Sequence, residues 1–190
     1  MRLSATILVA VFAFTTWLLA LPNQEAPVTK TMLSSPFYVA GFLVRTNNAD
    51  EASGKSKIGD LWQRFYKENL GAQIPNRADS ALTVVYSEYA TDEKGDYNYL
   101  LGARVTSVDH LPAGMTWKQV QSGTYAVIRT EVGQMPRVLQ ATWRRIWEMS
   151  PTEMGGKRAF VTDYEIYDER SANPANAQVE VHIGITPTSK

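Results

Sequence analysis

One repeat of secondary-structure patterns constrains the fold of this chain more than any other feature. A strand pattern, a helix pattern and two more strand patterns follow one another between Phe37 and Ser107. The same order returns between Trp117 and Ile185. One such unit cannot bury its own apolar faces, so we expect the two units to pack together as one pseudo-symmetric domain.

The spacing of the apolar residues supports this division. Both helix patterns have apolar residues at intervals of three and four, and each places a tryptophan on the apolar face, Trp62 in the first and Trp143 in the second. The strand patterns are rich in β-branched and aromatic residues and are separated by turn-forming segments. The helix patterns are KIGDLWQRFYKENLG and PRVLQATWRRIWEMS, and the strand patterns are FYVAGFLVRT, ALTVVYSEYA, YNYLLGARVTS, WKQVQSGTYAVIRTEV, AFVTDYEIYDER and QVEVHIGI.

These patterns predict an α+β fold made of duplicated βαββ units. Two halves of this kind merge their strands into one antiparallel sheet, and the two helices pack on one side of it. The pseudo-twofold seam between the halves is then the favoured place for a pocket, because ligand sites concentrate at junctions between structural sub-elements.

The composition excludes several classes of site. The chain of 190 residues has 19 basic and 19 acidic side chains, so no basic stripe favours nucleic acid as a partner. It has no cysteine, which excludes disulfides, thiolate nucleophiles and cysteine zinc sites. The two histidines, His110 and His182, lack metal-binding spacing, and TDEKGDY lacks the spacing of a calcium loop. We therefore expect neither a metal nor a cofactor.

The N-terminal segment is expected to lie outside the folded domain. Arg2 precedes a long run of uncharged, mostly apolar residues in the range 1–21, which is typical of a signal peptide or an N-terminal membrane anchor. The order of charges places the domain outside the cytoplasmic membrane, either free in the periplasm or attached to the membrane through the uncleaved segment. Residues 22–35 are predicted to be a linker and residues 36–190 the folded domain.

A carboxylate interrupts one of the aromatic strand patterns. In DYEIYDER, strand alternation puts Glu165 and Tyr167 on one face and Tyr164 and Ile166 on the other. Carboxylates are seldom fully buried, so an exposed surface glutamate is one interpretation. The other is a carboxylate at the back of an aromatic pocket, where desolvation raises the pKa unless a cation or a hydrogen bond compensates.

The aromatic residues supply the other candidates for a pocket. Tyrosine suits a binding site because its ring is a flat apolar wall and its hydroxyl is a hydrogen-bond partner. For the two helix tryptophans, packing in the core is the alternative role. The candidate ligand-binding residues are Glu165, Tyr167, Tyr125, Tyr86, Tyr89, Tyr99, Trp62 and Trp143.

Four stretches of the chain resemble the GyrI-like small-molecule-binding family, also described as the effector-binding domain of AraC-type and multidrug-responsive regulators. They are IGDLWQRFY, YSEYATDEKGDYNYLLGARV, LPAGMTWKQVQSGTYAVIRTEV, and LQATWRRIWEMSPTEM with DYEIYDER. The likeness spans roughly Pro36 to Ile185. It implies two βαββ units with a pocket at their junction, Glu165 at the pocket floor, aromatic and apolar walls, and ligands that are aromatic and cationic.

Three functions remain open on the sequence. The leading hypothesis is non-enzymatic binding of small amphipathic or cationic aromatic molecules, with Glu165 at the centre of the pocket. The second is hydrolysis of electrophilic small molecules, with Glu165 as general acid or base and a tyrosine such as Tyr125 assisting, although no independent catalytic motif supports it. The third is a module that binds a protein partner, which the sequence does not identify, through a sheet edge or an exposed surface.

Overall fold

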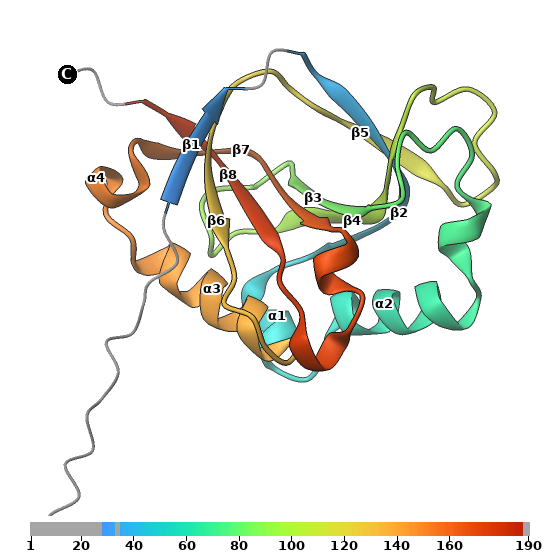
Figure 1. Cartoon of the computed structure of the whole chain (residues 1–190), viewed down its shortest axis with the longest axis horizontal. Helices are drawn as coiled ribbons and strands as arrows, with labels where there is room; N and C mark the ends of the chain where they lie inside the picture. The colour runs from blue at the N-terminus through green and yellow to red at the C-terminus, as the bar shows by residue number, and fades with distance from the viewer. Residues whose placement is uncertain (1–27, 33–34, 188–190) are drawn as a thin grey trace, which may run out of the picture.

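The computed structural model describes residues 28–32 and 35–187 of the chain (Figure 1). The predicted signal peptide or anchor, residues 1–21, lies outside the described residues. The strands are β1 (Val28–Met32), β2 (Phe37–Thr46), β3 (Leu82–Ser87), β4 (Tyr97–Val105), β5 (Thr116–Val120), β6 (Thr124–Arg129), β7 (Lys157–Tyr167) and β8 (Glu180–Thr186). The helices are α1 (Asn48–Ala52), α2 (Lys57–Lys67), α3 (Arg137–Glu148) and α4 (Pro151–Met154), with short 3-10 helices at Leu70–Gln73, Glu169–Ser171 and Pro174–Asn176.

The strands form one eight-stranded antiparallel sheet in the order β1-β6-β8-β7-β3-β4-β2-β5. The first unit is β2-α2-β3-β4 and the second is β6-α3-β7-β8, and in both units the last strand lies between the other two. β3 and β7 pair with each other from Leu82 opposite Tyr167 to Ser87 opposite Thr162, and this pair is the seam. The predicted α+β fold of duplicated βαββ units is therefore confirmed.

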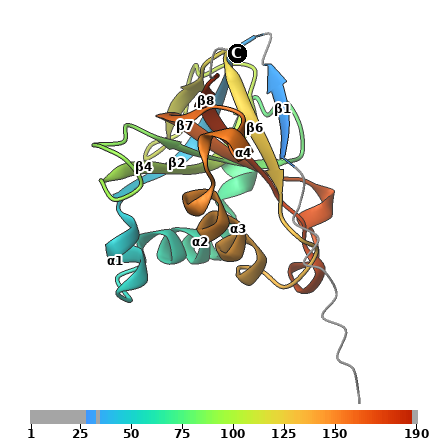
Figure 2. The ribbon, with the colours of Figure 1, turned by 90° about the vertical axis from the view of Figure 1, so that its left-hand side faces the viewer.

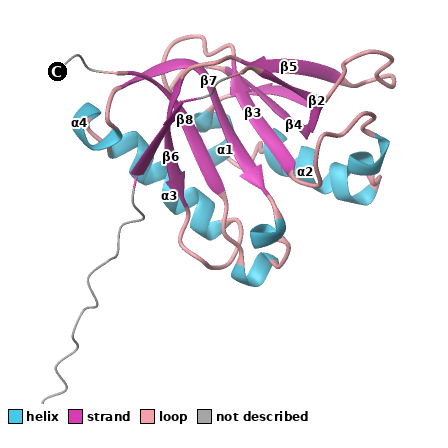
Figure 3. Ribbon diagram, turned by 45° about the horizontal axis from the view of Figure 1, so that its top comes forward, coloured by secondary structure: helices cyan, strands magenta, loops and turns pink. Residues whose placement is uncertain are grey.

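Both long helices pack on one side of the sheet, which we call the helix face (Figures 2 and 3). α2 buries Leu61 and Phe65 against it, and α3 buries Ile146. The opposite face has a core of its own that includes Tyr125 and Tyr164. Because apolar surface is removed from water on both sides, the sheet is held rigidly at its centre, where the seam runs.

Local hydrogen bonds determine where α2 begins. The side chain of Ser56 accepts a hydrogen bond from the backbone N–H of Gly59, as expected of a helix N-cap. Glu51 of α1 accepts hydrogen bonds from the backbone N–H groups of Lys57 and Ile58. These contacts satisfy donors that have no partner inside the helix, and they hold α1 beside the start of α2.

Two segments differ from the sequence-based expectation. The stretch from Trp117 to Val132, predicted as one strand pattern, is two strands in different parts of the sheet: β5 pairs with β2, and β6 pairs with β8. In addition, β1 lies within residues 22–35, the predicted linker, and pairs with β6. It forms a strand because β6 would otherwise present a row of unpaired backbone groups. No helix in the described part of the chain has both the length and the apolar character needed to cross a membrane.

An irregularity in β7 lies close to the seam. The register between β7 and β8 shifts between Arg158 and Asp163, and inside this bulge Phe160 has a φ of 50°. That conformation is unfavourable for a bulky residue, so the surrounding contacts must hold it. A bulge changes the direction of neighbouring side chains, and Arg158, at its start, lines the cavity described below.

Candidate functional site

A cavity of about 1030 Å³ lies on the helix face over the seam. Its volume is at the upper end of the range for small-molecule sites. Trp62 and Tyr66 of α2 form one wall, and Trp143 and Trp147 of α3 form another. Tyrosines of β3, β4 and β7 supply the floor, namely Tyr86, Tyr97, Tyr99 and Tyr167.

Glu165 lies directly beneath this aromatic floor. Its side chain is fully buried and does not itself line the cavity. Its Oε1 accepts hydrogen bonds from the Tyr86 hydroxyl, at 2.9 Å, and from Trp143 Nε1, at 2.6 Å. Its Oε2 accepts one from the Tyr167 hydroxyl, at 2.7 Å. All three donors are cavity-lining aromatic residues, so the carboxylate is separated from the cavity by the rings that bind it.

Burial raises the pKa of the Glu165 carboxyl, while the hydrogen bonds from Tyr167, Trp143 and Tyr86 act in the opposite direction. Within the described residues, no basic side chain lies in ion-pairing distance of Glu165. Three hydrogen bonds therefore stabilise the charge, but no cation among the described residues neutralises it. A site of this kind favours a cation from outside the chain.

The aromatic floor and walls are in mutual contact. The Tyr86 ring lies 4.9 Å from the Trp143 ring and 5.1 Å from the Tyr99 ring, between ring centres. The Tyr167 ring lies 5.1 Å from the Trp62 ring, and Trp62 Nε1 donates a hydrogen bond of 2.7 Å to the Tyr99 hydroxyl. Burial raises the pKa of the Tyr86 and Tyr167 hydroxyls well above their ordinary value, so both remain protonated donors. The rings are thus fixed in position before any ligand binds.

A second buried carboxylate lies two residues earlier on the same strand. Asp163 is fully buried, and its Oδ2 accepts hydrogen bonds from the Tyr89 hydroxyl, at 2.7 Å, and from Arg158 Nη2, at 2.6 Å. Its Oδ1 accepts a hydrogen bond of 2.8 Å from the backbone N–H of Gly184. Arg158 and Asp163 form an ion pair, so this group, unlike Glu165, is neutral as a whole.

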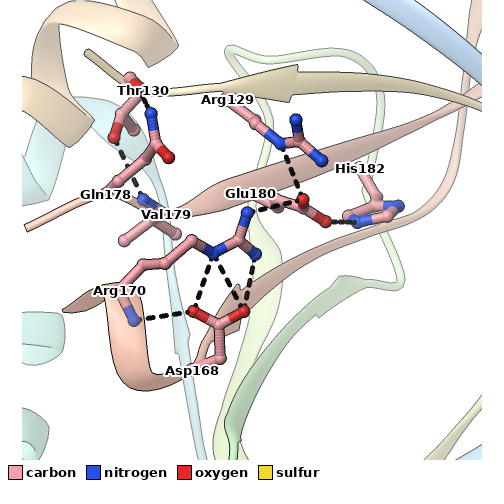
Figure 4. A network of polar contacts seen from close by, with 8 residues as sticks. All are labelled: Arg129, Thr130, Asp168, Arg170, Gln178, Val179, Glu180 and His182. Carbon is pink, nitrogen blue, oxygen red and sulfur yellow. Dashed lines mark hydrogen bonds and ion pairs between the residues drawn. The ribbon is translucent and has the colours of Figure 1, made fainter. Parts of the chain in front are cut away.

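A network of ion pairs fixes the segment that follows β7 (Figure 4). Arg170 donates from Nη2 to Asp168, at 2.6 Å, and from Nη1 to Glu180, at 3.0 Å. Arg129 donates to the same oxygen of Glu180, at 2.8 Å. The hydrogen bond from Arg170 holds the pKa of Asp168 below its usual range. Because Asp168 and Ser171 line the cavity, the network stabilises one of its walls.

The structure brings most of the predicted site residues together. Those that line the cavity or contact it from beneath are Glu165, Tyr167, Tyr86, Tyr89, Tyr99, Trp62 and Trp143. Tyr125 is the exception, because the structure places it outside the cavity. Its ring packs against Tyr164 on the opposite face of the sheet, and its hydroxyl donates to the Gln121 carbonyl. In β6 it is Ala126 and Ile128 that face the helices, so strand alternation directs Tyr125 away from Glu165.

Several cavity residues were missed by the sequence interpretation. Tyr66 and Trp147 lie four residues after Trp62 and Trp143, so helical spacing places them on the same faces as the predicted tryptophans. Both are exposed, by 68% and 41%, yet both line the cavity. Arg144 of α3 also lines the cavity. In the described parts of the chain, no cluster of His, Asp and Glu side chains has the arrangement needed to hold a metal ion.

The duplicated βαββ fold and the aromatic cavity at its seam define a small-molecule effector-binding domain of the GyrI-like kind. The family model described as "Cass2: Integron-associated effector binding protein" matches residues 34–185, and the chain belongs to this family. The chain is 29% identical to the putative transcriptional regulator protein YobU of Bacillus subtilis, over 77% of this chain and 90% of that protein. It is 30% identical to the transcriptional regulator BrlR of Pseudomonas aeruginosa over 67% of this chain, but covers only 46% of BrlR.

Two solved structures share the fold. The integron cassette protein VCH_CASS2, from the mobile metagenome of Vibrio cholerae, has 31% identity and a TM-score of 0.66 over 86% of this chain and 97% of its own. The structure of SAV2435 bound to tetraphenylphosphonium has a TM-score of 0.68 over 84% of this chain and 93% of its own. Its 15% identity makes this second likeness one of fold alone.

Proposed function

We propose that this protein binds lipophilic aromatic cations in the cavity between α2 and α3, without chemical turnover, and that Glu165 supplies the charge that selects them. The observation that carries the proposal is the buried carboxylate, whose hydrogen bonds come from cavity-lining aromatic side chains and which has no basic partner among the described residues. A bound cation would compensate a charge that the described residues leave without a basic partner.

The carboxylate would act through the aromatic floor as well as directly. A hydroxyl or indole N–H that donates to a carboxylate gives its ring a more negative face, and a cation is attracted to such a face. Tyr86, Tyr167 and Trp143 all donate to Glu165 while lining the cavity. A flat aromatic cation would therefore gain stacking energy, cation–π attraction and Coulomb attraction in one position.

The comparisons support the class of ligand. The family is one of effector-binding proteins, and a protein of the same fold has been solved with tetraphenylphosphonium, which is an aromatic cation. The environment of Glu165 also argues against a hydrolytic role. Its oxygens are enclosed by three aromatic donors, and Tyr125, the proposed assisting group, lies on the other face of the sheet.

Calorimetric titration of the purified full chain with tetraphenylphosphonium tests the proposal. Glu165→Gln removes the charge and keeps the shape of the side chain, and Glu131→Gln, at an exposed position outside the cavity, is the matched control. We expect binding by wild type and by the control, and binding weaker by about 300-fold in Glu165→Gln, from a charge pair some 5 Å apart at an effective dielectric constant of about 20. Equal affinity of all three proteins contradicts the role of the carboxylate.

We also propose that the domain acts outside the cytoplasmic membrane. The support is the apolar segment in residues 1–21, preceded by Arg2. The test is a fusion of the full chain to alkaline phosphatase, which becomes active only after export. We expect activity for the native segment and its loss in Val9→Arg/Phe12→Arg, which interrupts the apolar run. A native fusion that is inactive, although it accumulates in the cell, overturns this proposal.

A further inference from the structure

Arg158 has hydrogen-bond donors that no described residue accepts from. Its side chain is 9% exposed, and of its three nitrogens only Nη2 has a hydrogen-bond partner, Asp163. Nε and Nη1 are buried and have no partner among the described residues. A buried donor without a partner is unfavourable, and in native proteins such a donor calls for an explanation.

The position of Arg158 connects it to the cavity. It lines the main cavity and also a smaller neighbouring one of about 270 Å³. Its guanidinium lies 4.3 Å from the centre of the Phe160 ring and 6.0 Å from that of Trp143. Trp147 also lines both cavities and is 41% exposed, so its side chain lies at the boundary between the two spaces.

Trp143 lies between the two polar groups of the site. Its indole N–H donates to Glu165, and its ring contacts the guanidinium of Arg158. The carboxylate and the guanidinium are therefore separated by about one indole side chain, which is a distance that a single ligand of two or three rings can span. The site thus has a negative charge at Glu165 and, on the other side of Trp143, hydrogen-bond donors of Arg158 that have no partner among the described residues.

We propose that Arg158 is a second polar position of this pocket, which donates hydrogen bonds from Nε and Nη1 to a neutral acceptor on the ligand. The inference rests on the proposed function and narrows its ligand class to aromatic monocations that carry a carbonyl or similar acceptor. The cation lies at the Glu165 end, and the acceptor reaches past Trp143 towards the smaller cavity.

The charges of the site select a neutral acceptor over an anionic one. The positive charge of Arg158 is already balanced by Asp163, at 2.6 Å, so the ion pair as a whole offers no net attraction to an anion. With Glu165 ionised, the three groups sum to one negative charge, which one ligand cation neutralises. A carboxylate on the ligand would restore a buried negative charge next to Asp163, which is unfavourable.

Three matched probes test this inference in the full chain. They are triphenylphosphonium cations whose fourth ring carries a para-acetyl group, a para-isopropenyl group of the same shape without a carbonyl oxygen, or a para-carboxylate. We expect the acetyl probe to bind wild type about tenfold more tightly than the isopropenyl probe, which is the gain from a hydrogen bond with a charged donor. The carboxylate probe should bind more weakly than the acetyl probe.

The double variant Arg158→Met/Asp163→Asn removes both charges of the pair together, so no unpaired charge is buried. We expect the acetyl preference to disappear in it, so that the ratio of acetyl to isopropenyl affinity falls to about one whatever the change in overall affinity. Circular dichroism and thermal unfolding show whether the variant is folded. Equal binding of the acetyl and isopropenyl probes by wild type overturns the inference, whether or not the variant folds. If wild type binds none of the three probes, the proposed function is overturned instead.

Discussion

Replacing Glu165 with glutamine should make the unliganded protein more stable at neutral pH. Glutamine has the shape to keep the local hydrogen bonds: its Oε1 can accept from Tyr86 and Trp143, and its Nε2 can donate to the Tyr167 hydroxyl. The substitution removes a buried negative charge that has no basic partner among the residues that the structure describes. A buried ion costs several kcal/mol, and three charge-assisted hydrogen bonds offset most of that cost.

The direction of the pKa shift determines the sign and the pH dependence. The pKa of Glu165 is raised, so burial outweighs the hydrogen bonds and the ionised form is disfavoured in the folded state. Below the unfolded pKa of about 4.3, the side chain is protonated in both states and no stability is lost. As the pH rises through the raised folded pKa, wild type loses stability that Glu165→Gln keeps. We expect a gain of about 1 kcal/mol in the variant at pH 7.5, or about 2–4 °C in Tm.

Urea unfolding of wild type and Glu165→Gln at pH 4 and pH 7.5 measures this difference. We expect the two proteins to differ little at pH 4 and the variant to be more stable at pH 7.5. Saturating tetraphenylphosphonium should reverse the order at pH 7.5, because it stabilises wild type more than the variant. A variant that is destabilised equally at both pH values would show that Glu165 has a structural role and no uncompensated charge, and the reasoning would be refuted.

Three further predictions concern the cavity walls, the face of the sheet on which the cavity lies, and the protonation of Glu165. Trp147→Ala should weaken tetraphenylphosphonium binding by about fivefold to tenfold in a fluorescence titration, whereas Trp117→Ala, at a similar exposure but outside the cavity, should leave it unchanged. Tyr86→Phe should weaken the same binding by about fivefold, because it removes a hydrogen bond to Glu165. Tyr125→Phe should leave binding unchanged, because Tyr125 lies on the opposite face of the sheet. Equal losses of affinity in the two variants would contradict the placement of the cavity on the helix face. Calorimetry in buffers of different ionisation enthalpy should show that cation binding releases a proton at pH values near the raised pKa of Glu165. The affinity for the cation should rise as the pH rises. An affinity that does not change with pH would contradict the coupling between the cation and the Glu165 proton.

Much of this site follows from short-range patterns in the sequence. Strand alternation in β7 correctly separates Glu165 and Tyr167 from Tyr164 and Ile166, because a regular strand leaves no other choice. The same argument fails for Tyr125, because alternation shows that neighbouring side chains point to opposite faces but does not say which face meets the helices. That choice depends on how β6 pairs with β8, which is a long-range contact.

The charged part of the site was harder to foresee for a related reason. Arg158 and Asp163 lie on either side of a register shift in β7, and no simple period relates residues across a bulge. Their ion pair therefore has no signature in the sequence. The position of β1 could not be predicted from local patterns either, because its pairing partner β6 lies far along the chain. Local pattern identified the two long helices and most of the strands, while the contacts that complete the cavity depend on tertiary structure.

The most direct measurement compares tetraphenylphosphonium with tetraphenylborate, which has nearly the same shape and the opposite charge. We expect wild type to bind the phosphonium at least about 100-fold more tightly, and Glu165→Gln to lose most of that preference. If wild type binds both ions equally, or if Glu165→Gln keeps the full preference, then the buried carboxylate does not select the ligand.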